Sequence, residues 1–218
     1  FEIQCSHKTL NNIPILYSVK KQESWNTKYL HKHAINELLQ IYSHKPKKFL
    51  GFFSQKSMSR IISDSLLAYI IQDSSILNIG LYSSINSEVQ TDYLYRKLLD
   101  LNKSIFYPKI VANEMSFVKV NNIDELEILS HNFREPKNFL PEDIDKIDLF
   151  IVPSVALGSS GARLGYGSGF YDYTLENISR EKIFSIIFDF QFIENFEGEE
   201  HDIHASQIFT EIRTIKTN

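Results

Sequence analysis

An apolar run that ends in a glycine-rich loop is the feature that most limits how this chain can fold. Residues 147–152 form the run, Pro153 ends it, and a loop dense in small residues follows. Glycine lets backbone N–H groups approach an anion closely, because it has no Cβ atom. A strand, such a loop and a following helix predict a phosphate site at the start of the helix. The loop holds one arginine and then glycines at every second position: Arg163, Gly165, Gly167 and Gly169.

Apolar runs of strand length alternate with segments of helical spacing along most of the chain. This alternation predicts an α/β fold, a three-layer single domain with a mostly parallel sheet and helices on both faces. Ligands of such sheets bind at the carboxyl ends of the strands. The helices are expected over 28–42, 57–72, 88–101 and 170–178, and the strands over 76–82, 104–107, 115–120, 147–152, 183–188 and 207–209.

Three local expectations complete this outline. In the helix over 57–72, the residues expected to face inward are Ile61, Ile62, Leu66 and Tyr69. Pro108 is expected to end its strand, because proline cannot donate to a sheet ladder. Residues 121–146 are polar and irregular, with a short helical piece near 123–126.

The domain organisation is predicted to be simple. We expect an N-terminal extension of unknown role over 1–25, followed by the α/β domain over 26–218. Residues 1–20 of the extension have a weak strand pattern, which suggests an added edge strand.

Composition narrows the class of protein. The 218 residues are 43% hydrophobic and 23% charged, as in ordinary globular proteins. A formal charge of −4 gives no basic footprint for nucleic acid, although a local basic cleft is still compatible with it. Cys5 has no partner for an internal disulfide, and no apolar segment approaches the ~20 residues that span a bilayer. We therefore expect a cytoplasmic monomer that binds neither membrane nor nucleic acid.

The glycine loop matches neither of two common phosphate-binding patterns. It lacks the Lys-Ser/Thr ending of a P-loop, and its spacing is not that of the Rossmann dinucleotide fold. A tight strand-to-helix connection without any ligand is the structural alternative. The charged side chains at the two ends of the loop, Arg163 and Asp172, favour a ligand site.

The run from Val152 to Asp172 resembles the signature of the 5-formyltetrahydrofolate cyclo-ligase family. The shared positions are Gly161, Arg163, Leu164, Gly165, Gly167, Gly169, Phe170, Tyr171 and Asp172. Weaker similarities follow in the order of the family: Tyr82 with Glu88, Val89 and Thr91, then Pro108 with Met115 and Phe117, Glu135-Pro136, Gln191, His201-Asp202 and Thr210-Glu211. The resemblance covers residues 57–212.

The resemblance implies an enzyme that cyclises 5-formyltetrahydrofolate to 5,10-methenyltetrahydrofolate with ATP and Mg²⁺, releasing ADP and phosphate. In this chemistry the formyl oxygen is phosphorylated, N10 of the folate attacks, and phosphate leaves. The partners would be ATP and a reduced folate. Positioning and charge neutralisation would be the main tasks of the protein.

The resemblance also implies a role for individual residues. The catalytic residues would be Arg163 and Tyr171. ATP and its phosphates would contact Lys28, Lys32, Arg163, Leu164, Gly165, Gly167, Gly169 and Tyr171. The folate would contact Tyr82, Glu88, Met115, Tyr166, Gly167, Ser168, Gly169 and Phe170. Magnesium would bind Asp172 and Asp202.

Each of these side chains also has a plain structural interpretation. An arginine is usually at the surface, an aspartate in the first turn of a helix is stabilised by the helix dipole, and Asp202 stands in an acidic loop. Glu88 would be an acid at the start of a helix, and the aromatic and methionine side chains would be core. Lys28 and Lys32 would belong to a solvated helix face, with Lys20 or Lys21 as alternatives for the phosphate contact.

Three positions support a second reading, a folate- or nucleotide-binding relative with weak or no catalysis. Gly158 and Ser168 stand where the family often has an acidic and a basic residue. Lys32 stands where the family has an arginine, which makes a two-pronged phosphate contact that lysine cannot make.

Overall fold

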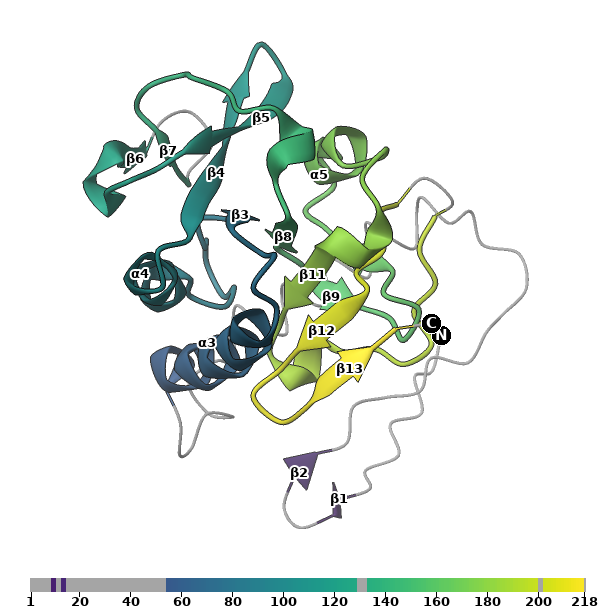
Figure 1. Ribbon diagram of the computed structural model, residues 1–218. Helices are drawn as coiled ribbons and strands as arrows, with labels where there is room; N and C mark the ends of the chain where they lie inside the picture. The colour runs from purple at the N-terminus through teal and green to yellow at the C-terminus, as the bar shows by residue number, and fades with distance from the viewer. Residues whose placement is uncertain (1–8, 11–12, 15–53, 129–132, 200–201, 218) are drawn as a thin grey trace. The chain divides into compact units, whose positions relative to one another are not determined.

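The computed structural model describes residues 9–10, 13–14, 54–128, 133–199 and 202–217 (Figure 1). The chain divides into two units, Phe1–Ile41 and Tyr42–Asn218. In place of the single edge strand expected near the N-terminus, β1 (Thr9–Leu10) and β2 (Ile13–Pro14) pair antiparallel with each other. The helix expected over 28–42 lies outside the described residues.

A seven-stranded sheet forms the centre of the second unit, in the order β13-β12-β11-β8-β3-β4-β5. The five inner strands are parallel, and β13 and β5 pair antiparallel at the two edges. This confirms the mostly parallel α/β sheet. The strands are β3 (Asn78–Gly80), β4 (Ser104–Val111), β5 (Glu114–Lys119), β8 (Leu149–Val152), β11 (Ile183–Ile186), β12 (Gln207–Phe209) and β13 (Thr214–Lys216).

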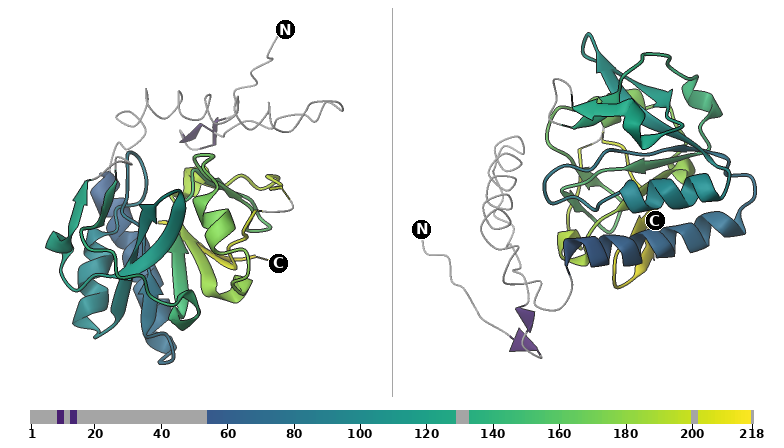
Figure 2. Two further views of the ribbon diagram at one scale, coloured as in Figure 1. Left: turned by 90° about the horizontal axis from the view of Figure 1, so that it is seen from above. Right: turned by 90° about the vertical axis from the view of Figure 1, so that its left-hand side faces the viewer.

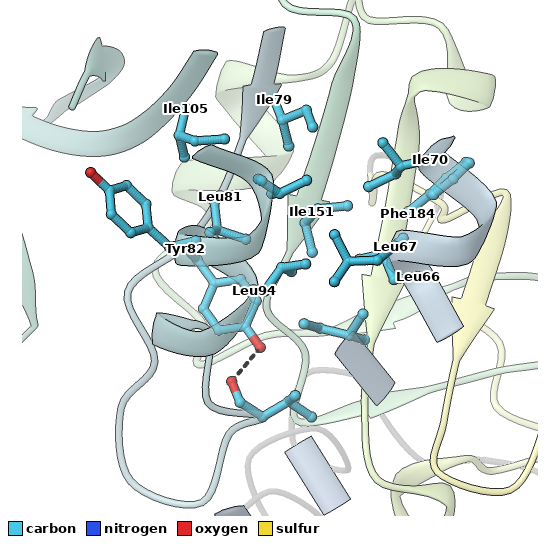
Figure 3. Close-up of a cluster of buried hydrophobic side chains, with 14 of the residues drawn as sticks. Leu66, Leu67, Ile70, Ile79, Leu81, Tyr82, Leu94, Ile105, Ile151 and Phe184 are labelled. Carbon is cyan, nitrogen blue, oxygen red and sulfur yellow. Dashed lines mark hydrogen bonds between the residues drawn. The ribbon is translucent and has the colours of Figure 1, made fainter. Parts of the chain in front are cut away.

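Helices cover both faces of this sheet, as the alternation of strands and helices predicted. α3 (Gln55–Gln72) and α4 (Asp92–Asp100) lie together on one face, and α5 (Phe170–Thr174) lies on the other (Figure 2). β8 shows the division, because Ile151 packs with the α3 and α4 side of the core and Phe150 with the α5 side. Figure 3 shows the larger cluster, in which strand residues meet Leu66, Leu67 and Leu94 of the helices.

The helix expected over 57–72 forms as α3, two residues longer at its start. The side chain of Ser54 caps it by accepting a hydrogen bond from the N–H of Ser57 at 3.2 Å. Ile62 and Leu66 are buried as expected, but Ile61 and Tyr69 are 40% and 37% exposed. The buried face of α3 is shifted around the helix from the expected one, because Met58, Leu67 and Ile70 are buried in place of Ile61 and Tyr69.

The helix expected over 88–101 begins only at Asp92, and the preceding residues form a loop. The hydroxyl of Thr91 does not cap the helix; it donates instead to the carbonyl of Tyr82 at 2.8 Å. The hydrogen bond from Thr91 to Tyr82 thus joins the two ends of the loop after β3. Glu88 lies in this loop and not in the helix, which begins at Asp92.

The strand expected to stop at Pro108 continues through it to Val111. Pro108 lies opposite Phe117 of β5, whereas β3 ends at Gly80, opposite Phe106. No β3 residue therefore stands beside Pro108, and the missing N–H donor costs no ladder bond.

Several short elements had no clear sequence signal. The irregular stretch 121–146 contains a hairpin of β6 (Leu126–Ile128) and β7 (Arg134–Pro136), and the glycine loop contains one of β9 (Ala156–Leu157) and β10 (Arg163–Leu164). The helix expected over 170–178 ends at Thr174. Short 3-10 turns are η1 (Ile123–Glu125), η2 (Ile144–Lys146), η3 (Arg180–Lys182) and η4 (Asp189–Gln191).

None of the helices in the described part of the chain is both long and apolar enough to cross a membrane.

Candidate active site at the carboxyl ends of β3 and β8

The candidate site lies where the order of the parallel strands reverses. From β3 the chain proceeds to β4 on one side, and then returns to place β8 on the other side of β3. Loops that leave neighbouring strands in opposite directions create the usual ligand position of open α/β sheets. The loop after β3 carries Glu88, and the loop after β8 is the glycine loop.

Two glycines at the start of the glycine loop serve backbone packing. A Cβ atom on Gly158 would lie 2.1 Å from the carbonyl oxygen of Phe196, and one on Gly161 would lie 2.0 Å from that of Ala205. Gly161 also has a φ of 82°, which favours glycine. Gly158 stands where the family often has an acidic residue, and in this chain glycine is the residue that fits the contact with Phe196.

The three glycines at alternating positions differ in their surroundings. A Cβ atom on Gly165 would lie 2.7 Å from Nη1 of Arg163, whereas Gly167 and Gly169 have no atom within 4 Å of that position. Gly167 and Gly169 have φ angles of 89° and 69°. The exposed part of the loop thus combines a left-handed backbone with open space above it, as an anion cradle requires. Ser168 lies between them and is exposed.

Arg163 and Asp172 form an ion pair with each other. Nη2 of Arg163 donates to both carboxylate oxygens of Asp172, at 2.7 and 2.8 Å. The two side chains are 5% and 16% exposed. The interpretation of Arg163 as a surface arginine is therefore wrong. Leu164, the next residue of β10, is buried and pairs with Ala156.

Glu88 is the buried carboxyl group of the site, with 5% exposure. Burial raises its pKa to about 7, although a hydrogen bond from the N–H of Ile85 at 2.8 Å acts in the opposite direction. The loop after β3 holds this carboxyl group inward, since Gln55 of α3 donates to the carbonyl of Glu88 at 2.9 Å.

Three tyrosines surround Glu88. Burial raises the pKa of Tyr82, Tyr166 and Tyr171, and the charge of Glu88 raises each of them further. Arg163 acts in the opposite direction on Tyr171, whose ring centroid lies 5.6 Å from the guanidinium carbon. The structure thus brings Glu88 from one loop together with Tyr166 and Tyr171 from the other, a proximity that the sequence did not reveal.

The apolar residues predicted to contact folate differ in exposure. Tyr82 and Met115 are 2% and 7% exposed and belong to the two core clusters. The hydroxyl of Tyr82 donates to the carbonyl of Val89 at 2.9 Å, so this ring supports the Glu88 loop (Figure 3). Phe170 and Tyr171 are partly buried, and Tyr166 is 42% exposed. Tyr166 and Tyr171 offer more surface to a ligand than Tyr82 does.

One residue of this site had not been singled out in the sequence. The side chain of Asn86 hydrogen-bonds the hydroxyl of Tyr166, which lowers the pKa of that group against the effect of burial. Asn86 has a φ of 49°, a conformation that asparagine adopts more readily than most residues. The sequence signal that could have indicated Asn86 is its type, because asparagine is common in turns and Asn86 stands just before Glu88.

The described residues do not assemble a resident magnesium site. They contain no group of three His, Cys, Asp or Glu side chains placed to hold a metal ion. Both oxygens of Asp172 are bound by Arg163, and one carboxylate oxygen of Asp202 accepts from the N–H of Glu199 at 2.7 Å. The metal roles of Asp172 and Asp202 stay predictions, and the donor set in this conformation does not fit Mg²⁺.

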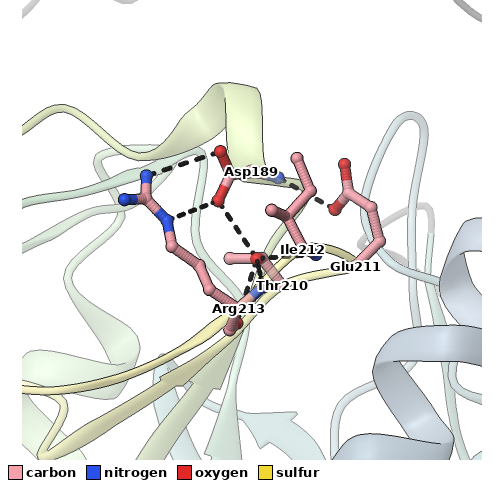
Figure 4. Close-up of polar contacts among 5 residues, drawn as sticks. All are labelled: Asp189, Thr210, Glu211, Ile212 and Arg213. Carbon is pink, nitrogen blue, oxygen red and sulfur yellow. Dashed lines mark hydrogen bonds and ion pairs between the residues drawn. The ribbon is translucent and has the colours of Figure 1, made fainter.

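Some of the predicted contacts cannot be placed. Lys28 and Lys32, predicted for the ATP phosphates, and the alternatives Lys20 and Lys21 lie outside the described residues, as does His201. Nearer the C-terminus, Thr210 and Glu211 both hydrogen-bond Asp189, the first residue of η4 (Figure 4). The hydroxyl of Thr210 donates to the carboxylate of Asp189 at 3.1 Å, and Glu211 accepts from its N–H at 3.0 Å.

The fold and the site define an α/β protein with an open glycine loop beside a buried carboxyl group at the switch point of a parallel sheet. The chain belongs to the 5-formyltetrahydrofolate cyclo-ligase family, whose sequence model matches residues 53–211. The site was located from the order of the strands in the sheet, and the family was assigned from the sequence. The two conclusions are therefore independent of each other.

Individual relatives agree with this assignment. The 5-formyltetrahydrofolate cyclo-ligase of Mycoplasma genitalium is 30% identical over 148 residues, which is 66% of this chain and 79% of the relative. That of Escherichia coli K12 is 30% identical over 141 residues, 61% of this chain and 76% of the relative. The 5,10-methenyltetrahydrofolate synthetase of Aquifex aeolicus shares the fold with a TM-score of 0.68 at 23% identity, covering 87% of this chain and 91% of that one.

Proposed function

We propose that this chain catalyses the ATP-dependent cyclisation of 5-formyltetrahydrofolate to 5,10-methenyltetrahydrofolate. The observation that carries the proposal is the meeting of the open glycine loop with buried Glu88 at the switch point of the sheet, in a chain whose relatives carry the name of this activity. A cytoplasmic location and a monomeric state stay predictions.

The reaction joins phosphoryl transfer to ring closure. The formyl oxygen attacks the γ-phosphorus of ATP, and the bond to the leaving ADP breaks. N10 of the folate then attacks the formyl carbon and loses its proton, and the C–O bond to phosphate breaks. The product is the methenyl cation, with ADP and phosphate. Such steps depend mainly on position and on neutralisation of charge.

The glycine loop supports the nucleotide side of the proposal. The backbone around Gly167 and Gly169 is exposed and left-handed, with no side chain over it. In this conformation backbone N–H groups are free to donate to phosphate oxygens without a Cβ atom in the way. MgATP is the expected form of the nucleotide, since Mg²⁺ is commonly bound through substrate phosphates with few protein carboxylates.

Glu88 and the tyrosines support the folate side. The pterin ring carries N–H groups on one edge, and a buried carboxylate is a strong acceptor for such donors. With a pKa of about 7, Glu88 is partly ionised at neutral pH and gains its charge fully when donors bind it. Tyr166 and Tyr171 supply flat surface beside it for an aromatic ring.

A spectrophotometric assay tests the proposal. Purified protein with 5-formyltetrahydrofolate and MgATP should give a rise in methenyl-folate absorbance that stops when ATP is left out. Glu88→Gln should raise the KM for folate at least about tenfold, as expected for loss of a charged hydrogen-bond partner. Glu142→Gln is the matched control, because Glu142 forms an exposed ion pair with Lys146. No ATP-dependent rise would refute the enzymatic proposal.

The second candidate is a binding protein that retains the pocket without turnover. The observation that favours it is charge, because Arg163 is buried and exposed Ser168 is uncharged, so the open part of the loop carries no basic side chain between Gly165 and Gly169. Binding of 5-formyltetrahydrofolate without hydrolysis of ATP, measured by calorimetry and phosphate release, would establish this alternative.

A further inference from the structure

A buried ion pair joins the two ends of the glycine loop. Arg163 belongs to β10 and Asp172 to α5, and the exposed residues 166–169 lie between them in the chain. Because Nη2 of Arg163 reaches both carboxylate oxygens of Asp172, the pair fixes the separation of the strand and the helix. The loop is therefore closed into a ring by side chains that solvent hardly reaches.

The pair is also bound to its surroundings. Nη1 of Arg163 donates to the carbonyl of Pro153 at 3.3 Å, and Oδ1 of Asp172 accepts from the N–H of Ile203 at 3.3 Å. The guanidinium lies over Tyr171. One ion pair thus connects the end of β8, β10, the start of α5 and the segment before β12.

This environment leaves Arg163 little surface for a ligand. Its side chain is 5% exposed, and both terminal nitrogens already donate to protein oxygens. Nε of Arg163 has no hydrogen-bond partner, but it is buried as well, so a phosphate could reach the guanidinium only if the side chain moved outward and away from Asp172. Breaking a buried pair in this way is costly, because an unpaired charge stays behind in a poorly solvated place.

The exposed part of the loop depends on its ends for its shape. No atom lies within 4 Å of the place where a Cβ atom would stand on Gly167 or Gly169. Gly169 directly precedes α5 and gives the helix no side-chain cap. Glycine also has more conformational freedom to lose than any other residue. The ordered backbone that a phosphate needs must therefore come from the anchors at 163 and 172.

We propose that Arg163 is a positioning residue, which acts through Asp172 to hold the glycine loop in its phosphate-binding conformation and does not itself bind phosphate. The proposal rests on the proposed function for the identity of the ligand. It assigns Asp172 to the same task, in place of a direct magnesium contact.

Binding of ADP in the presence of EDTA distinguishes positioning from direct contact, because no metal takes part. If Arg163 binds phosphate directly, Asp172→Asn releases the guanidinium and removes a nearby negative charge, so ADP binds equally well or more tightly. If Arg163 positions the loop, Asp172→Asn weakens ADP binding about tenfold or more, as does Arg163→Lys, whose ammonium cannot reproduce the fork. The double variant should then be no weaker than the weaker single variant.

Kinetics and hydrogen exchange complete the test. The KM for MgATP should rise about tenfold in both single variants. The KM for the folate should rise less, because only its contacts with Tyr166 and Tyr171 depend on this loop. Amide exchange of a peptide covering 165–174 should accelerate in both variants. The matched control is Arg213→Lys, at the more exposed ion pair with Asp189, which should leave both readouts unchanged (Figure 4).

The outcomes separate this proposal from the proposed function. Unchanged or tighter ADP binding by Asp172→Asn, or unchanged exchange over 165–174 with a native-like circular dichroism spectrum, would overturn the positioning role. If the wild-type protein binds neither ADP in EDTA nor ADP with Mg²⁺, the proposed function fails, and hydrogen exchange alone then decides whether the pair orders the loop. Faster local exchange at an unchanged melting temperature would support it.

Discussion

The guanidinium of Arg163 occupies the space in which a side chain at position 165 would stand. A Cβ atom on Gly165 would lie 2.7 Å from Nη1 of Arg163, which is closer than real Cβ atoms approach a neighbour. The position of the Arg163 guanidinium is therefore sufficient to explain glycine at 165. This relationship gives the glycine loop two parts, an anchored start and an open end at Gly167 and Gly169.

Gly165→Ala should disturb the loop through Arg163. The added methyl group displaces the guanidinium from Asp172, and we expect a loss of about 1–3 kcal/mol in the free energy of unfolding, typical of overpacking. Urea unfolding and ADP binding measure the two effects together. If both the free energy of unfolding and the ADP affinity stay unchanged, the methyl group does not displace Arg163 from Asp172, which contradicts this prediction.

Gly161→Ala and Gly167→Ala should differ, although both residues have a positive φ, of 82° and 89°. Gly167 has open space around it, so its replacement should cost only the backbone strain of about 1 kcal/mol. A methyl group at Gly161 would meet the carbonyl of Ala205 at 2.0 Å, and we expect a loss above about 3 kcal/mol or failure to fold. Equal midpoints in urea unfolding would contradict the packing role of Gly161.

Glu88→Gln should stabilise the protein at high pH. The buried carboxyl group has a pKa of about 7, raised from an ordinary value of 4.5, so the folded protein retains a proton that the unfolded chain has already lost. Stability therefore falls as the pH rises from about 4.5 through about 7, and the glutamine variant lacks this fall. The variant should gain up to about 3 kcal/mol at pH 8 and nothing at pH 4.

Urea unfolding of both proteins at a series of pH values tests this expectation. The difference between the two free energies removes the contribution of all other titrating groups. A constant difference between pH 4 and pH 8 would mean that the pKa of Glu88 is not raised in the folded protein.

Tyr82→Phe should loosen the loop that carries Glu88. It removes the donor to the carbonyl of Val89, and an unpaired buried carbonyl costs about 1–3 kcal/mol in stability. The KM for folate should rise while the KM for MgATP stays unchanged, since the glycine loop is not touched. Tyr69→Phe is the control, on a ring that is 37% exposed and packs edge-on against Phe184. A rise in both KM values would contradict this division of the site.

Local patterns predicted much of the fold. The apolar runs that became β8, β11 and β12 are strands with mostly buried residues, and the helix expected over 57–72 forms as α3. Of the four α3 residues expected to face inward, Ile61 and Tyr69 are exposed. Errors arose where a tertiary contact overrides a local preference. Pro108 continues a strand because no β3 residue stands beside it, and the helix before Leu101 starts late because Thr91 hydrogen-bonds Tyr82 instead of capping it.

The sequence by itself determined the family, the α/β class and the loop that matters, because glycine spacing and apolar runs are local properties of the chain. Only the tertiary structure decided what surrounds each residue of that loop. Arg163 is paired with Asp172 inside the protein, and the three alternating glycines have different neighbours. The physical reason is that burial and charge pairing depend on which segments meet, and here Glu88, Arg163 and Asp172 acquire their surroundings from strands far apart in the chain.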